Sequence, residues 1–120
     1  MPNRSYLGIE CADNNEWIVV HLVNGQPDFP RTFGNTPTEL ASLARFISED
    51  CLKPRICLNP KKPGALKLLK FIAAIPDVEV VLLSDEGFRM HGAWLLETEH
   101  DYAESANRAV LLARCAKRMI

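Results

Sequence analysis

Two β-rich segments at the start of the sequence, residues 5–12 and 16–24, restrict the possible folds more than any other feature. Only a short polar turn separates them, so we expect the two strands to pair antiparallel as a hairpin. The second segment closes at Asn24-Gly25, a strong turn signal, and a third short strand is expected within residues 28–35. Pro30 cannot donate to a strand ladder, which favours an edge position for this third strand. The chain is therefore expected to begin as an antiparallel meander.

A helix start with several independent signals follows the meander. In TPTELASLARFI, Thr36 is expected at the N-cap, Pro37 at the first helical position and Glu39 in a capping box. Apolar residues then recur at helical spacing, namely Leu40, Leu43, Ala44 and Ile47.

Strands and helices alternate along the rest of the chain. PRICLN (54–59) is predicted to form a buried strand and DVEVVLLSDEG (77–87) a fifth strand, with a helix over 62–75 between them. That helix is expected to bury Ala65, Leu68, Leu69 and Ile72 and to expose Lys67 and Lys70. Residues 88–96 fit a short helix, and a final helix is predicted from about His100 to Met119, with Ala103, Ala106, Val110 and Ala113 on one face.

This order predicts an α/β fold with a mixed five-stranded sheet. An antiparallel meander of three strands would be extended by two parallel strands through right-handed crossovers, with helices on both faces. It is the strand and helix order of the ribonuclease H-like fold. No linker-like segment interrupts the chain, so a single domain over residues 1–120 is expected.

Composition limits the classes of function. The formal net charge of -1 argues against binding nucleic acid by overall charge, so such a role would need local basic patches or a partner. The four cysteines show no C-x-x-C spacing and the first residues lack a signal-peptide pattern, which predicts a cytoplasmic protein with reduced, partly buried thiols. Apolar stretches are too short to span a membrane, so no membrane association is expected.

Glu10 is an unusual residue for the middle of an apolar strand. Alternation places it on the same face as Tyr6 and Gly8, and the small Gly8 is expected to leave room beside the carboxylate. A buried carboxylate is costly unless it is compensated. Glu10 must therefore lie at an edge, pair with a cation of the protein, or act as a metal ligand.

Four segments resemble, in order, parts of one protein family. They are YLGIECADNNEWIVVHLVNG (6–25), NTPTELASLARFI (35–47), PRICLNP (54–60) and DYAESANRAVLLAR (101–114). Together they resemble the N-terminal DEDD domain of bacterial insertion-sequence transposases, a relative of the RuvC-type Holliday-junction resolvases. The resemblance runs from about Tyr6 to about Ala116 and implies a ribonuclease H-like domain. Because the transposases carry a further domain, an intact transposase is not expected.

The resemblance also implies a site at the end of the sheet, where the family holds two divalent ions, Mg²⁺ or Mn²⁺. Glu10 matches the acid of the family's G-I-D strand, and Asp101 and Glu104 match its D-x-x-D motif. Asn59 matches the position of a family Glu. Carboxylates suit this chemistry because hard divalent cations prefer oxygen ligands and can activate water. The neutral amide of Asn59 departs from the pattern and, with Glu10 in place of Asp, weighs against catalysis.

Each of these residues also has a structural explanation. Glu10 can pair with a Lys or an Arg. Asp101 suits the start of the last helix, and Glu104 can pair with Arg108 four residues later. Asn59 precedes a proline, as is common where a strand enters a turn.

Other polar residues favour structural or surface roles. The three histidines follow no metal-ligand spacing, and Ser84, Asp85 and Glu86 at the end of the fifth strand fit either a ligand site or a helix cap. Basic residues form two groups that resemble solvated helix faces, Lys61, Lys62, Lys67 and Lys70, and Arg114, Lys117 and Arg118.

Three functions remain. The preferred one is a catalytically degenerate, transposase-related domain that acts as an interaction module for DNA or another nucleic acid, or for a protein partner. The alternatives are an active divalent-metal-dependent nuclease of the resolvase type and a nucleotide-binding relative of the actin-like ATPases, whose glycine-rich phosphate motifs are missing here. Met90, Trp94 and Leu95 fit either a homodimer contact or the core.

Overall fold

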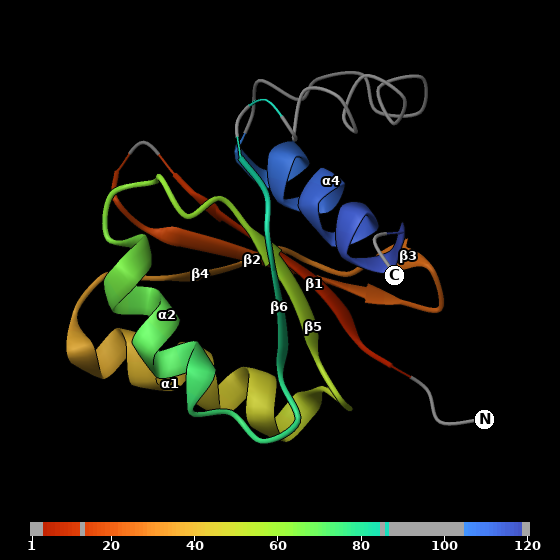
Figure 1. The fold of residues 1–120 in the computed structure, drawn as a ribbon, viewed down its shortest axis with the longest axis horizontal. Helices are drawn as coiled ribbons and strands as arrows, with labels where there is room; N and C mark the ends of the chain where they lie inside the picture. Colours follow the sequence, from red (N-terminus) through yellow and green to blue (C-terminus); the bar gives the residue numbers. More distant parts are fainter. Residues whose placement is uncertain (1–3, 13, 85, 87–104, 119–120) are drawn as a thin grey trace.

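The structure has an α/β fold in which helices pack against a mixed β-sheet (Figure 1). The computed structural model describes residues 4–12, 14–84, 86 and 105–118. Its strands are β1 (Tyr6–Cys11), β2 (Trp17–Val23), β3 (Gln26–Pro27), β4 (Arg31–Phe33), β5 (Arg55–Leu58) and β6 (Glu79–Leu82). Its helices are α1 (Pro37–Asp50), α2 (Ala65–Ala73) and α4 (Ser105–Arg118).

Strand β1 lies at the centre of the sheet. It pairs antiparallel with β2 and parallel with β5, and β6 continues the parallel side next to β5. The strand order is β3-β2-β1-β5-β6, and β4 also pairs with β2. The predicted mixed sheet, antiparallel on one side and parallel on the other, is confirmed.

The third strand expected within residues 28–35 is present as β4, but the prediction of five strands is wrong. A further short strand, β3, precedes β4 and pairs with β2 at a different place along it, so the described residues form a sheet of six strands. Between them, the backbone N–H of Asp28 donates to the carbonyl of His21 at 2.9 Å. Pro30 lacks the N–H that would continue the ladder, which interrupts the strand at this point.

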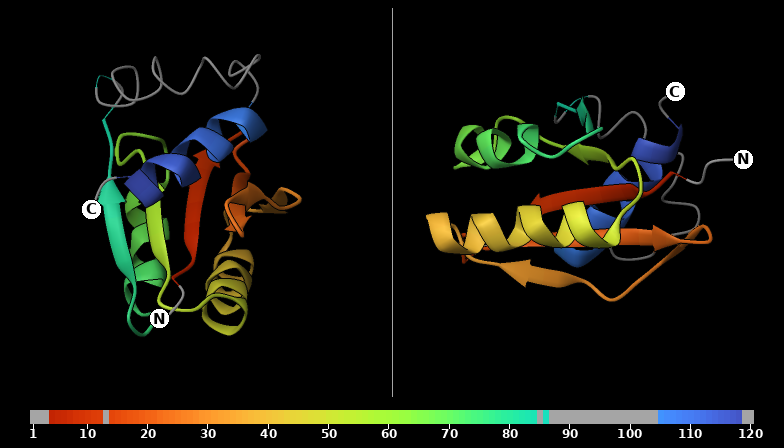
Figure 2. Two further views of the ribbon diagram at one scale, coloured as in Figure 1. Left: turned by 90° about the vertical axis from the view of Figure 1, so that its right-hand side faces the viewer. Right: turned by 90° about the horizontal axis from the view of Figure 1, so that it is seen from below.

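Alternation along β1 separates two cores on opposite faces of the sheet. Figure 2 shows α1 and α2 on one face and α4 on the other. Leu7 and Ile9 belong to the larger core under α1 and α2, whereas Gly8 lies against α4. The larger core also contains Trp17, Val19, Leu40, Leu43, Ile47, Ile56, Leu58, Ala65, Leu68, Ile72 and Ile75. On the α4 side, the buried residues include Val20, Cys57, Ala109, Leu111, Leu112, Cys115 and Ala116. The expected helices on both faces are therefore present.

Helix α1 begins as the sequence predicts, with one difference in its cap. The side chain of Thr36 accepts from the backbone N–H of Glu39 at 3.2 Å, and Pro37 is the first helical residue. The Glu39 carboxylate accepts from the N–H of Gly34 at 3.1 Å and so ties the helix to the preceding turn. Leu40, Leu43 and Ile47 are buried as predicted, and Ala44 is half-buried.

The strands β5 and β6 and helix α2 lie within their predicted ranges but are shorter, β6 most clearly, and Leu69 is half-buried where burial was expected. All four residues of β5 are buried, and α2 buries Ala65, Leu68 and Ile72 while Lys67 and Lys70 are exposed. The predicted short helix within 88–96, the contact residues Met90, Trp94 and Leu95, and the first residues of the predicted last helix lie outside the described residues. No helix within the described ranges is long and apolar enough to cross a membrane.

Asn35, which precedes the N-cap of α1, links strand β2 and helix α2 through hydrogen bonds. Its Oδ1 accepts from the indole N–H of Trp17 at 3.0 Å, and its backbone carbonyl accepts from Lys67 Nζ at 3.2 Å. The Trp17 side chain is buried in the larger core, so its N–H depends on this one protein acceptor.

Replacing Asn35 by alanine is expected to lower the free energy of unfolding by about 1–3 kcal/mol, because a buried donor loses its acceptor. Urea denaturation followed by tryptophan fluorescence measures this loss. Asn35→Asp keeps an acceptor oxygen and should lose clearly less. Equal losses for the two variants would show that the hydrogen bond to Trp17 is not the cause.

Candidate functional site

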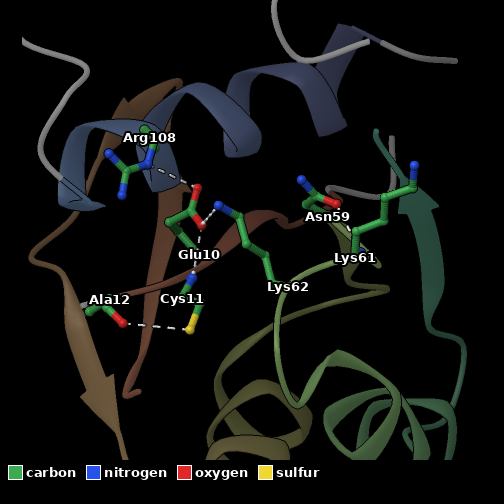
Figure 3. A network of polar contacts seen from close by, with 7 residues as sticks. All are labelled: Glu10, Cys11, Ala12, Asn59, Lys61, Lys62 and Arg108. Atoms are coloured by element: carbon green, nitrogen blue, oxygen red, sulfur yellow. Dashed lines mark hydrogen bonds and ion pairs between the residues drawn. The ribbon is translucent and has the colours of Figure 1, made fainter. Parts of the chain in front are cut away.

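The candidate site lies where the carboxyl ends of β1 and β5 meet helix α4 (Figure 3). The two strands are parallel, with Ile9 in register with Leu58, so Glu10 and Asn59 follow at the same end of neighbouring strands. Arg108 approaches from the first half of α4, and Lys62 from the loop between β5 and α2. The sheet thus brings together side chains that are far apart in the sequence.

Glu10 is the centre of the site and is only 4% exposed. Its Oε2 accepts from Arg108 Nε at 3.2 Å, and its Oε1 lies 3.6 Å from Lys62 Nζ. Oε1 also accepts from the backbone N–H of Cys11 at 3.0 Å. Both carboxylate oxygens are therefore occupied by donors of the protein.

These contacts decide between the three explanations for a carboxylate in β1. Glu10 is neither exposed nor at an edge, because β1 is the central strand. Burial without compensation would cost several kcal/mol, and two cations compensate it here. In this structure, Glu10 is an ion-paired residue with two positive charges around one negative charge.

Asn59 has a defined role in the turn after β5. It is 7% exposed, and its Oδ1 accepts from the backbone N–H of Lys61 at 2.9 Å. Its backbone carbonyl accepts from the N–H of Lys62 at 3.4 Å. The side chain thus stabilises the turn that directs Lys62 towards Glu10, which agrees with the strand-to-turn explanation from the sequence.

The expectation that Gly8 leaves room beside Glu10 is wrong. Helix α4 crosses β1 at this glycine, and a Cβ atom placed on Gly8 would lie 2.0 Å from the carbonyl oxygen of Ala109 and 2.4 Å from the N atom of Ala113. Gly8 allows the helix and the strand to approach closely. The backbone of α4 therefore fills the space that was expected to be free beside Glu10.

Two of the four predicted site residues, Asp101 and Glu104, lie outside the described residues. Their convergence with Glu10 stays a prediction. Within the described ranges, no group of three or more His, Cys, Asp or Glu side chains is arranged to hold a metal ion. His21, in the same ranges, is half-buried, and burial is the main reason why its pKa is lowered.

Lys62 and Arg108 are the two residues whose roles the sequence analysis missed. Lys62 was assigned to a solvated basic group, and Arg108 was considered only as a partner of Glu104. The available signal was Glu10 itself, because a buried carboxylate predicts nearby cations without saying where in the chain they are.

The four cysteines are free thiols, as expected. Cys57 on β5 and Cys115 on α4 are buried in the same core. Burial, with a smaller contribution from Cys115, raises the pKa of Cys57, and burial raises the pKa of Cys51 to about 11. Thiols that stay protonated are poor nucleophiles, so neither Cys51 nor Cys57 is a candidate for covalent catalysis.

A scan against profiles of known protein families finds no match, and a search of curated proteins finds no match either.

Proposed function

We propose that the chain is a ribonuclease H-like domain, related to the DEDD domain of insertion-sequence transposases, that has lost metal chemistry and acts as an interaction module for nucleic acid or for a protein. The strand order supports the assignment of the fold, since an antiparallel hairpin with β1 at the centre is extended by the parallel strands β5 and β6. Helices on both faces agree with it.

The ion pairs of Glu10 carry the proposal. In the family that the sequence resembles, the matching carboxylate binds divalent metal ions. Here Arg108 and Lys62 supply positive charge to both oxygens from within the chain. A divalent ion at Glu10 would have to displace these cations or lie close to them, and repulsion between like charges in a buried site is strong. The neutral Asn59 adds no charge to attract such an ion.

An active metal-dependent nuclease is the second candidate, and one contact favours it. Arg108 touches Glu10, and Glu104 precedes Arg108 by only four residues in the sequence. The segment with the D-x-x-D-like motif therefore leads directly into the part of α4 that contacts the first acid. If Asp101 and Glu104 reach the same point, three acids would surround it.

Titration with Mn²⁺ or Mg²⁺ separates the two candidates. For the inactive module, millimolar metal is expected to leave the unfolding temperature unchanged apart from the small shift that a Glu10→Gln control also shows. A functional site at one hundred times its Kd would add about 2.7 kcal/mol to the free energy of unfolding. A shift of that size that Glu10→Gln abolishes, together with cleavage of DNA in Mn²⁺, would overturn the proposal in favour of the nuclease.

Asn59→Glu provides a positive control for the alignment with the family. Restoring the family carboxylate should create measurable Mn²⁺ binding by calorimetry, and combining it with Lys62→Met should strengthen that binding. If both variants remain as inert to metal as the wild type, the assignment of Asn59 to the family position is wrong.

A further inference from the structure

A shallow groove of about 360 Å³ separates helices α1 and α2 on the face of the molecule away from α4. Its lining consists of Ala41 and Ala44 from α1 and Lys70, Phe71 and Ala74 from α2. Because alanine side chains are short, they leave space between the two helices. Phe71 forms an apolar wall of the groove.

Cations border this apolar floor on both sides. Lys70 lines the groove from α2, and Arg45 follows Ala41 by four residues and therefore shares its side of α1. Both side chains belong to exposed residues. Among the residues that the structure describes, neither of them makes an ion pair.

Leu66 extends the apolar surface next to Lys70. It precedes Lys70 by four residues on α2, so the two side chains lie on the same side of the helix. Leu66 is 74% exposed, which is high for a leucine in a helix that otherwise buries its apolar residues well. An exposed large apolar residue beside an apolar groove is typical of a surface that is covered by a partner.

We propose that the α1–α2 groove binds an acidic amphipathic helix of a protein partner. An apolar stripe of such a helix would lie on Ala41, Ala44, Phe71 and Ala74, and its acidic flanks would pair with Arg45 and Lys70. The inference rests on the proposed role as an interaction module and gives that module a partner of defined chemistry. It uses a surface on the opposite side of the sheet from Glu10.

Two other occupants fit the groove less well. A second copy of the chain meeting it symmetrically would bring two copies each of Arg45 and Lys70 into one interface, and these like charges repel each other. Nucleic acid would meet a floor of alanines with Phe71 as its one aromatic residue, whereas single strands bind to several aromatic platforms. An acidic helix satisfies both the apolar floor and the charged borders.

The test uses the whole chain and a fluorescein-labelled synthetic helix of about 18 residues, which is five turns. Its leucines are spaced i, i+3, i+4 and i+7, and its remaining positions are glutamate and alanine. Fluorescence anisotropy is expected to show saturable binding that Lys70→Glu weakens about tenfold and that added salt also weakens. Ala41→Glu, which places a carboxylate on the floor, should weaken binding by a similar factor.

Lys117→Glu is the matched control, because Lys117 is an exposed helix lysine on α4 and lies away from the groove. It should bind the peptide like the wild type. A peptide of the same composition with scattered leucines should not bind. Circular dichroism verifies that every variant is folded, as expected for exposed positions.

Three results would overturn the inference: no binding of the peptide, equal binding by Lys70→Glu, or binding of a DNA oligonucleotide that Lys70→Glu abolishes. Dimerisation in sedimentation experiments that Ala41→Glu abolishes would assign the groove to a second copy instead and overturn it as well. The metal titration is independent of this experiment. If metal binds at Glu10 and the peptide still binds, only the proposed loss of metal chemistry is refuted. If neither metal nor peptide binds, only the proposed peptide site in the groove is refuted.

Discussion

Replacing Gly8 by alanine is expected to destabilise the protein by about 3 kcal/mol or more, or to prevent folding altogether. The added Cβ would lie 2.0 Å from the carbonyl oxygen of Ala109 and 2.8 Å from Leu112 Cβ. The first of these contacts is with backbone, which cannot move aside like a side chain. Helix α4 would have to lift from β1, and this would disturb the core around Cys57.

Gly34→Ala is the matched control for this variant. Its added Cβ would meet the side chain of Glu39 at 3.2 Å, and this flexible side chain can yield. A change within about 0.5 kcal/mol is expected there, as for most surface substitutions. Urea denaturation measures both variants. If Gly8→Ala were as stable as Gly34→Ala, α4 could not approach β1 as closely as the structure has it.

Replacing Arg108 by methionine is expected to cost about 2–3 kcal/mol. Breaking a fully buried ion pair by removing one partner costs about 3–5 kcal/mol. The value expected here is lower because the Arg108 side chain is 21% exposed and Lys62 continues to compensate Glu10. The shift of the urea midpoint, with an unchanged denaturant slope, measures this cost.

A double-mutant cycle tests whether the cost arises from Glu10. If Glu10→Met is combined with Arg108→Met, the carboxylate that the arginine compensates is removed as well, and the double variant should be more stable than the sum of the single losses predicts, by about 1–3 kcal/mol. Lys117→Met on the same helix should have almost no effect. Strictly additive losses for Glu10 and Arg108 would mean that the contact contributes nothing to stability.

The fold was largely predictable because its signals are local. Each signal lies within a single strand or helix. The signals are the alternation in the first two strands, the Thr36-Pro37 helix start and the apolar spacing of α1 and α2. These signals led to the order of the longer described elements and to a mixed sheet. The short strand β3 was missed because proline is rare in strands and its two residues, Gln26 and Pro27, directly follow the Asn24-Gly25 turn.

The candidate site was less predictable because its contacts are not local. Glu10 was identified as an unusual buried acid from the strand pattern alone, and Asn59 was correctly explained as a turn residue. Arg108 lies 98 residues from Glu10, and only the packing of α4 across β1 brings the two together. Lys62 reaches Glu10 because the Asn59 turn directs it there, and its sequence neighbours resemble those of any exposed lysine.

The dependence of β1 on α4 has a consequence for how the protein is made. While a nascent chain leaves the ribosome, β1, β2 and β5 are available long before α4 is. Until α4 emerges, β1 and β5 lack the helix that packs on Gly8 and Cys57, and Glu10 lacks its arginine partner. Ribosome-bound chains that end before α4 should therefore be cleaved readily by an added protease. Resistance to cleavage should appear only in chains long enough for α4 to have left the ribosome.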